Sequence, residues 1–283
     1  MSGSVLSAAP VNARCFRALR AAFAAVLASS FGAAAQQPGE PGGNAPPETE
    51  IPISVPTPIP VGFSIAWKPT ILSVRADSGV GTEFGSDKFQ PLRGLARYTT
   101  TWLGEKLLAR AEIEGGQFQT ETENIGTQGW DVTFRLLGGT ATRLSQKLAI
   151  TASAGLLTRY QHGRAENAAP NFGVLGLTSN IELEYRLAPV IAVSVYFEGG
   201  IGTLAYGSQE NLGGLSDSSE LRWRLQISFD LTPTTAVDVG YDFTRWHASF
   251  NKSNLLQPSG PSNQALLLEA REHAVSLSLR FKP

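Results

Sequence analysis

From Gly62 onward, apolar and polar residues alternate with a period of two in segments of about ten residues. The clearest segment covers residues 221–231 and places six apolar residues on one face, with Arg222 and Arg224 on the other. A helix would scatter those apolar residues around its circumference, whereas successive side chains of a strand point to opposite faces. The segment therefore predicts a β-strand with one apolar and one polar face.

The same alternation predicts further strands along the chain. Clear ones cover residues 181–187, 191–198, 237–243 and 275–281, and fainter ones lie within 63–76, 95–103, 107–118, 130–144 and 148–160. Pro69 lies inside the first of these strands. Because proline has no N–H to donate to a ladder, we expect a bulge or a shifted strand start there.

Connections between these strands alternate between tight turns and longer polar segments. Tight turns fall near residues 104–105, 145–146, 188–189 and 232–234, and long segments cover 77–92, 119–129, 162–175, 207–218 and 251–269. Four turns and five loops join ten strands and leave both ends of the barrel on the tight-turn side. Outer-membrane barrels have short periplasmic turns, long external loops and an even number of strands. We predict an all-β antiparallel transmembrane barrel over residues 62–283 with ten strands; eight or twelve are the alternatives.

Alternation fits an apolar exterior and an apolar core equally well, because inverting the barrel leaves the pattern unchanged. Three features favour the apolar exterior: the asymmetry of the connections, an N-terminal export signal, and aromatic residues placed as a membrane-interface girdle. These aromatic residues of the apolar face are Trp102, Trp130, Tyr160, Tyr185, Trp223 and Tyr241. A secreted lipocalin-like barrel is the alternative.

The first 35 residues are typical of a targeting segment. They contain no acidic residue, place Arg14, Arg17 and Arg20 before a small-apolar stretch, and end in the A-x-A site 33–35. We expect a signal peptide over residues 1–35 and a location in the bacterial outer membrane; a mitochondrial presequence is the alternative. Residues 36–61 are rich in proline and predict an extended leader, either passive or in contact with a periplasmic partner.

Composition narrows the class of partner. Charged residues make up 17% and apolar residues 42%, which excludes a disordered chain. Removing the three arginines of the signal peptide leaves 20 basic residues against 24 acidic ones, so no nucleic-acid partner is expected. Three histidines without local Cys or carboxylate spacing make no zinc signature, and we expect neither a metal nor a cofactor.

The polar faces of the predicted strands carry charges of both signs, which would project into the barrel. A ten-stranded barrel is barely wider than its inward side chains, so we expect a hydrogen-bonded charge network that closes the lumen. A narrow polar pore for small solutes is the alternative. The residues predicted for this network are Arg110, Glu112, Arg135, Glu182, Glu184, Arg186, Glu198, Arg222, Arg224, Asp238 and Asp242.

The C-terminal segment 275–281 resembles the signal by which bacterial outer-membrane proteins are recognised for assembly. Its matching positions are Val275, Leu277, Leu279 and Phe281. Lys282 and Pro283 follow the aromatic residue, which is usually the last one of such signals. The resemblance implies an outer-membrane β-barrel protein whose partners are the assembly machinery, membrane lipid and lipopolysaccharide. It implies no particular site.

Two families of outer-membrane hydrolases bear on activity. Omptin proteases resemble this chain in strand number but need paired acidic residues and an Asp–His couple, and Asp217, Asp242 and His247 do not reproduce their motifs. His247-Ala-Ser249 resembles the His-x-Ser spacing of outer-membrane phospholipases, in which His activates Ser, but has no third group to orient the imidazole. We therefore predict a non-enzymatic barrel with a structural or surface-interaction role. A narrow channel and a lipid or peptide hydrolase are the alternatives.

Overall fold

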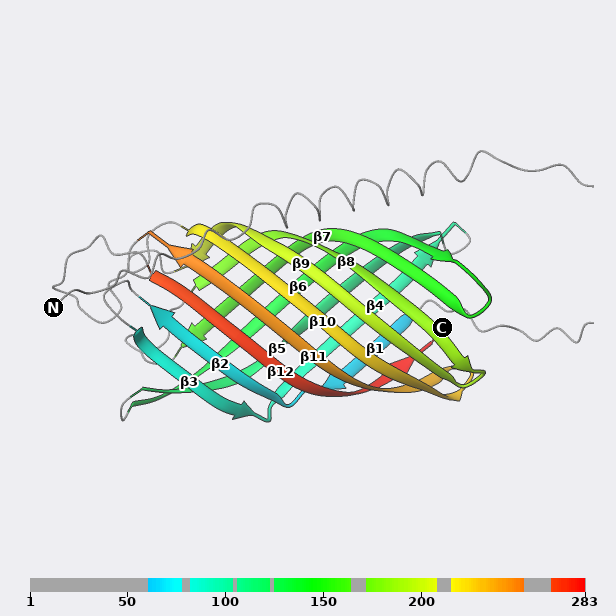
Figure 1. Cartoon of the computed structure of the whole chain (residues 1–283), viewed down its shortest axis with the longest axis horizontal. Coiled ribbons are helices and arrows are strands. Elements are labelled where there is room, and N and C mark those ends of the chain that lie inside the picture. Colours follow the sequence, from blue (N-terminus) through cyan, green and yellow to red (C-terminus); the bar gives the residue numbers. More distant parts are fainter. Residues whose placement is uncertain are drawn as a thin grey trace, which may run out of the picture. The chain divides into compact units, whose positions relative to one another are not determined.

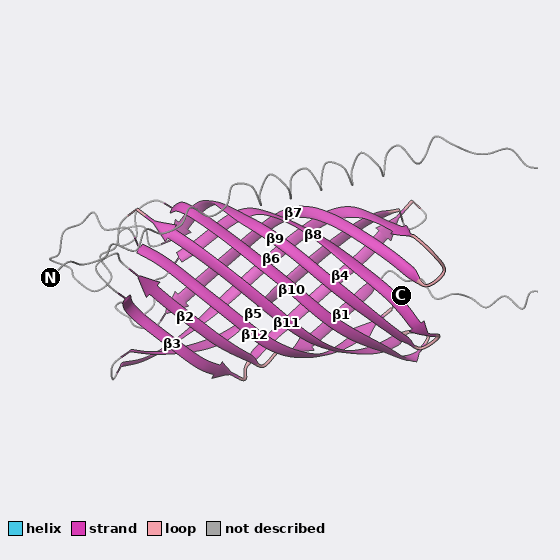
Figure 2. Ribbon diagram, in the orientation of Figure 1, coloured by secondary structure: helices cyan, strands magenta, loops and turns pink. Residues whose placement is uncertain are grey.

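The computed structural model of the chain describes residues 61–77, 82–103, 106–122, 125–163, 172–207, 215–251 and 266–282. The expected signal peptide and the proline-rich leader up to residue 60 lie outside these residues. Every regular element described is a β-strand, and all strand pairs are antiparallel, so the predicted class is confirmed (Figures 1 and 2). No helix in the described ranges is long and apolar enough to cross a membrane.

The strands form one sheet that closes on itself. Their bounds are β1 Gly62–Trp67, β2 Thr70–Asp77, β3 Thr82–Gln90, β4 Arg93–Trp102, β5 Leu107–Thr122, β6 Ile125–Arg143, β7 Leu148–Gly163, β8 Phe172–Ala188, β9 Ile191–Gly207, β10 Leu215–Thr232, β11 Thr235–Phe250 and β12 Leu266–Phe281. A ring of ten strands runs from β1 through β4 to β12 and is closed by the pairing of β12 with β1. The remaining two, β2 and β3, form an extra hairpin beside β12. The predicted number of ten strands in the ring is confirmed.

The first predicted strand is interrupted at Pro69. Before the interruption Trp67 pairs with Leu277, and after it Thr70 pairs with Ala274, so both strands advance by the same three residues. The expected bulge or shifted start is therefore wrong: the ladder has a gap, but its register is unchanged. A proline without an N–H explains the gap.

Several predicted loops are shorter in the structure. Residues 82–90, expected within a loop over 77–92, form β3 and pair with β2. Most of the expected loop over 119–129 belongs to β5 and β6, because their ladder continues as far as the pair Thr122 and Ile125. β7 likewise extends to 163, β9 to 207 and β12 starts at 266, so the other three long segments are shortened too. These strand ends are held by backbone hydrogen bonds and lack the apolar alternation on which the prediction depended.

The wall of the barrel is apolar outside and charged inside. On β10, Leu225 is 46% exposed while its neighbour Arg224 is buried and Arg222 is 0% exposed. Outward aromatic residues lie toward both ends: Trp102 and Tyr185 near the tight turns, and Trp130 with Tyr160, ring centroids 5.2 Å apart, near the long loops. A soluble barrel would have the opposite polarity, so the lipocalin-like alternative is wrong.

A second, apolar layer fills the inside of the barrel near the long loops. Phe172 lies at its centre, with ring centroids 5.8 Å from Trp246 and 5.5 Å from Phe250. Its buried members are Leu72, Val74, Phe118, Phe172, Val174, Trp246, Ala248, Phe250, Leu268 and Ala270. This layer was not expected from the sequence, because the inward positions of the predicted strands are expected to be polar.

The seam between β1 and β12 requires a glycine at position 62. Gly62 has φ 118°, and a side chain there would place its Cβ 1.9 Å from the carbonyl oxygen of Phe281, so only glycine fits. Among the described residues no strand pairing joins β3 to β5. Instead, Nε2 of the Gln90 side chain donates to the backbone carbonyl of Gln119 at 3.1 Å, and Oε1 of Gln90 accepts from the backbone N–H of Gln119 at 3.0 Å.

Candidate functional site

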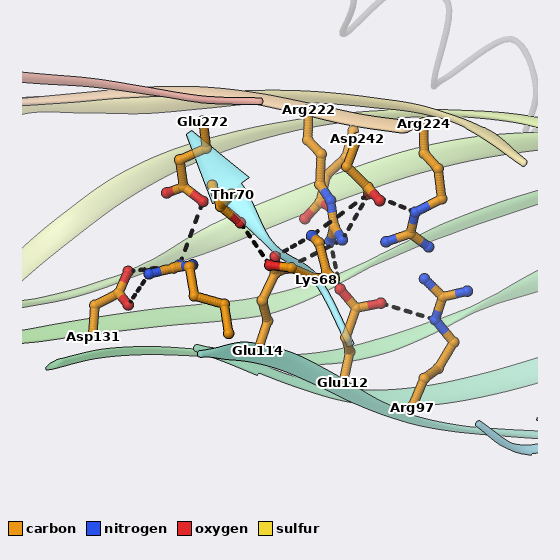
Figure 3. A network of polar contacts seen from close by, with 12 residues as sticks. Lys68, Thr70, Arg97, Glu112, Glu114, Asp131, Arg222, Arg224, Asp242 and Glu272 are labelled. Atoms are coloured by element: carbon orange, nitrogen blue, oxygen red, sulfur yellow. Dashed lines mark hydrogen bonds and ion pairs between the residues drawn. The ribbon is translucent and has the colours of Figure 1, made fainter. Parts of the chain in front are cut away.

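The inner face of the barrel carries one connected set of ion pairs, which we call the lumen network (Figure 3). Its cationic members in the described ranges are Lys68, Arg93, Arg97, Arg135, Arg159, Arg222 and Arg224. Its anionic members there are Glu112, Glu114, Asp131, Glu198, Glu220, Asp242 and Glu272. Equal numbers of each sign leave the network formally neutral.

Arg222 and Arg135 each form ion pairs with four carboxylates. The guanidinium of Arg222 lies 2.5 Å from Glu112, 3.1 Å from Glu114 and 3.3 Å from Asp242, measured between nitrogen and carboxylate oxygen. Glu198 is 3.7 Å away. These four carboxylates belong to β5, β9 and β11, so one cation on β10 connects three other strands.

Arg135 also contacts four carboxylates, three of which it shares with Arg222. Its Nε donates to Glu198 at 2.8 Å, its Nη1 lies 3.3 Å from Glu112 and 3.4 Å from Glu114, and its Nη2 donates to Glu220. Arg159 then continues the network, 3.0 Å from Glu220 and 3.2 Å from Glu272. A planar guanidinium with five N–H donors suits such multiple pairing better than an ammonium group would.

Some of these contacts cross the whole lumen. In the ten-strand ring, β5 lies five places from β10, and β7 lies five places from β12. The pairs Arg222 with Glu112 and Arg159 with Glu272 therefore connect opposite walls. Lys68, at the interruption between β1 and β2, adds a contact to Glu114 on β5 (Figure 3). The middle of the lumen is thus occupied by side chains.

Tyr196 supports the centre of the network from β9. It is buried, and its hydroxyl donates to Glu198 at 2.8 Å. Its ring centroid lies 5.5 Å from the guanidinium carbon of Arg224, 5.8 Å from that of Arg222 and 5.9 Å from that of Arg110. An aromatic face attracts a nearby cation, so this ring stabilises the buried guanidinium groups without adding an anion.

Smaller ion pairs lie beside the lumen network. Arg110 binds Glu182 at 2.6 Å, and Arg280 binds Asp238 at 3.0 Å. Asp230, near the tight turns, is 3.1 Å from Arg186 and 2.5 Å from Lys282. Charged pairing therefore continues from the middle of the barrel to the tight-turn end.

All eleven residues proposed from the sequence face the inside of the barrel. Six belong to the lumen network, namely Glu112, Arg135, Glu198, Arg222, Arg224 and Asp242. The other five are in the smaller pairs: Arg110 with Glu182, Asp238 with Arg280, and Arg186 with Asp230 and, at 3.9 Å, with Glu184. Four further members of the network lie on the polar faces of predicted strands but were not among the eleven: Arg97, Glu114, Asp131 and Arg159. Sequence reasoning missed the remaining four, which lie next to a proline or before the start of a predicted strand: Lys68, Arg93, Glu220 and Glu272.

Where the charged and apolar layers meet, a cavity of about 20 Å³ lies among Arg159, Glu220, Phe172, Val174 and Trp246. One water molecule needs roughly 10–15 Å³ of space for its centre, so the cavity has room for about one. It is far too small for a solute. The described residues contain no group of three or more His, Cys, Asp and Glu side chains that could hold a metal ion.

The residues considered for hydrolase chemistry lie on different faces of β11. Asp242 is inside, bonded to Arg224 at 2.6 Å, whereas His247 is outside, where it contacts Ser219 and Asp217. The omptin-like couple of Asp242 and His247 therefore does not form. Ser249 shares the outer face with His247, but within the described residues the imidazole ring is hydrogen-bonded to Ser219 and Asp217 and not to the Ser249 hydroxyl.

The outward apolar belt, the charged interior and the closed ring decide the location. The barrel spans the bacterial outer membrane. No protein-family model and no curated protein matches the chain.

Solved structures similar to it are outer-membrane barrels. The outer membrane protease OmpT from Escherichia coli is 10% identical, with 78% of this chain and 95% of that chain covered and a TM-score of 0.44. The NanC porin is 8% identical over 76% of this chain and all of its own, TM-score 0.35. Neisserial surface protein A is 12% identical over 78% and 97%, TM-score 0.32. At such identities the likeness concerns the barrel fold alone.

Proposed function

We propose that the protein is a closed outer-membrane barrel with a structural or surface-interaction role, and that its lumen does not conduct solutes. The observation that carries this proposal is the pair of contacts that cross the lumen, Arg222 with Glu112 and Arg159 with Glu272. Buried charges are stable only when paired, and here the pairing itself fills the space that a solute would need. The apolar layer around Phe172 adds a second obstruction toward the long loops.

A closed lumen leaves the outer wall and the long loops for function. The wall contacts membrane lipid and lipopolysaccharide through its apolar belt and the polar residues above it. The outward residues of β12 support recognition by the assembly machinery, because Val275, Leu277 and Phe281 are all exposed to the lipid side. These surfaces remain available whether or not the lumen is hydrated.

A narrow channel is the second candidate, and one observation favours it. Within the described part of the chain, Arg97 Nη2, Arg110 Nη1 and Arg224 Nη2 are buried without a hydrogen-bond partner. Such donors attract water, and a continuous file of water would carry small ions.

Planar-bilayer recordings separate the two functions. We expect the purified wild-type protein to leave the membrane silent at potentials at which an open porin gives discrete steps. The matched positive control removes both crossing contacts together, as Arg222→Ala with Glu112→Ala and Arg159→Ala with Glu272→Ala. Discrete steps from the wild type would overturn the closed-lumen proposal and establish the channel.

A further inference from the structure

The outer wall holds a second group of polar side chains, separate from the lumen network. Ser219 on β10 and His247 on β11 are directly opposite each other in the ladder. The hydroxyl oxygen of Ser219 lies 3.0 Å from Nδ1 of His247, and Oδ2 of Asp217 lies 3.1 Å from Nε2 of the same ring. One imidazole thus connects a hydroxyl to a carboxylate.

The chemistry of the three groups determines the direction of both hydrogen bonds. An ionised carboxylate only accepts, so Nε2 of His247 carries the hydrogen and donates it to Asp217. In the neutral ring Nδ1 is then the acceptor, and Ser219 must donate its O–H to it. This is the arrangement in which a base activates a serine and an acid orients the base, with the roles of the two ring nitrogens exchanged relative to serine proteases.

The group lies at the upper boundary of the apolar belt. On β10, the outward residues from Leu221 to Leu231 are apolar. Ser219 is the outward residue before Leu221 and lies about 7 Å from it along the strand. On the neighbouring strand the apolar Phe243 is followed by Arg245 and His247. This boundary is where acyl chains meet polar headgroups, and the ester carbonyls of membrane lipids lie between the two.

Two arginines extend the polar surface beside the group. Arg245 and Arg271 are opposite each other on β11 and β12, 52% and 56% exposed at the side chain, and both contact Glu269, at 2.9 Å and 3.2 Å. Two guanidinium groups on one carboxylate leave N–H donors directed to the surroundings. Arg245 is the diagonal neighbour of Ser219 in the ladder, within reach of a long side chain, so it is placed to bind a lipid phosphate or a developing oxyanion.

We propose that Ser219, His247 and Asp217 are a catalytic triad that hydrolyses a carboxylic ester of a membrane lipid. Oγ of Ser219 attacks the carbonyl carbon while Nδ1 of His247 takes the hydroxyl proton. The bond from the carbonyl carbon to the alcohol oxygen breaks, and His247 returns the proton to that oxygen. Water then attacks the acyl-serine, delivering one proton through His247 back to Oγ, and the fatty acid leaves. Asp217 holds the ring and balances the charge of the imidazolium that forms in each step.

This activity is independent of the closed lumen, because the group faces outward and the lumen network faces inward. It departs from the non-enzymatic role expected from the sequence. His247 is the histidine of the His-x-Ser motif, but the serine that the imidazole contacts comes from the neighbouring strand.

The test uses the full-length protein refolded in vesicles, with folding checked by heat-modifiability on gels. A fluorophosphonate probe should label the wild type at Ser219 and should not label Ser219→Ala. Fatty-acid release is measured from vesicles of phosphatidylethanolamine and, separately, from purified lipopolysaccharide. We expect Ser219→Ala, His247→Gln and Asp217→Asn to lower the rate, with a loss on the order of 10²–10⁴-fold for His247→Gln.

The matched control is Ser249→Ala, which removes the serine of the sequence motif from the same outer face and should keep the wild-type rate. Release from only one of the two substrates identifies the source of the ester and supports the proposal. A folded wild type that neither reacts with the probe nor releases fatty acid would overturn it. So would equal labelling of the wild type and Ser219→Ala. Bilayer conductance of Ser219→Ala should equal that of the wild type, so failure of the triad and failure of the closed lumen are distinguishable.

Discussion

Arg222 and Glu112 meet across the full width of the lumen, 2.5 Å apart and 110 residues apart in the chain. Replacing Arg222 by Ala leaves Glu112, Glu114 and Asp242 with one cation fewer in a buried setting. We expect a loss of roughly 3–5 kcal/mol in the free energy of unfolding, because an uncompensated buried charge is strongly destabilising. Denaturant unfolding in lipid vesicles measures it.

The control for this prediction is the double variant Arg222→Leu with Glu112→Leu. It removes both partners of one crossing pair, so its cost should be below the sum of the two single costs. Unchanged stability of Arg222→Ala together with a shifted cation preference in bilayers would mean that water solvates the carboxylates, contrary to the closed lumen.

The lipid face can be tested on β10. Leu225 is half-exposed on the outer face near the middle of the apolar segment, so Leu225→Arg should destabilise the barrel by roughly 2–4 kcal/mol. Gln226→Leu should be milder, because Gln226 faces inward and its side chain loses one hydrogen bond, to Ser228 at 3.3 Å. Loss of heat-modifiability in Gln226→Leu but not in Leu225→Arg would reverse our assignment of inside and outside.

The side chain of Gln90 bridges β3 and β5 through two hydrogen bonds. Gln90→Ala removes both hydrogen bonds to the backbone of Gln119, and we expect a cost of about 1–3 kcal/mol with faster amide exchange at Gln119. Gln117→Ala is the matched control, since its side chain is exposed and its backbone N–H keeps its bond to Leu92. Equal exchange at Gln119 in both variants would show that the carboxamide does not hold the seam.

Export remains testable without the structure. Signal peptidase should cleave after Ala35, so N-terminal sequencing of the protein extracted from membranes should begin at Gln36. A start before residue 30 would contradict the A-x-A interpretation.

The ten strands of the ring could be predicted well from the sequence. Each of them crosses the membrane, and a strand with one face on lipid alternates between apolar and polar residues. The extra hairpin and the strand ends were predicted poorly, because β3 and the tip of β5 are held by backbone bonds with no apolar pattern. Glu220 and Glu272 illustrate the same limit. They continue the inner faces of β10 and β12, yet they precede the apolar runs at 221 and 275 from which those strands were inferred.

The contact between Ser219 and His247 could not be predicted from the sequence, for a different reason. Residues two apart on one strand share a face but lie about 7 Å apart, whereas direct partners on neighbouring strands have Cβ atoms about 5 Å apart. Ser249 satisfies the first relation with His247, and Ser219 satisfies the second. Only the register between β10 and β11 identifies the second serine. That register includes an irregularity between Asp230 and Thr232, next to the tight turn, which the spacing within one strand does not show.

The crossing contacts also have a kinetic consequence. Arg159 and Glu272 belong to β7 and β12, on opposite walls of the ring, so we expect them to meet only when the sheet closes. Contacts that form after the rate-limiting step do not speed folding, but they must be broken before the barrel can open. The interior charges therefore act chiefly on the rate of unfolding, and they favour a barrel that, once closed, stays closed for long times in the membrane.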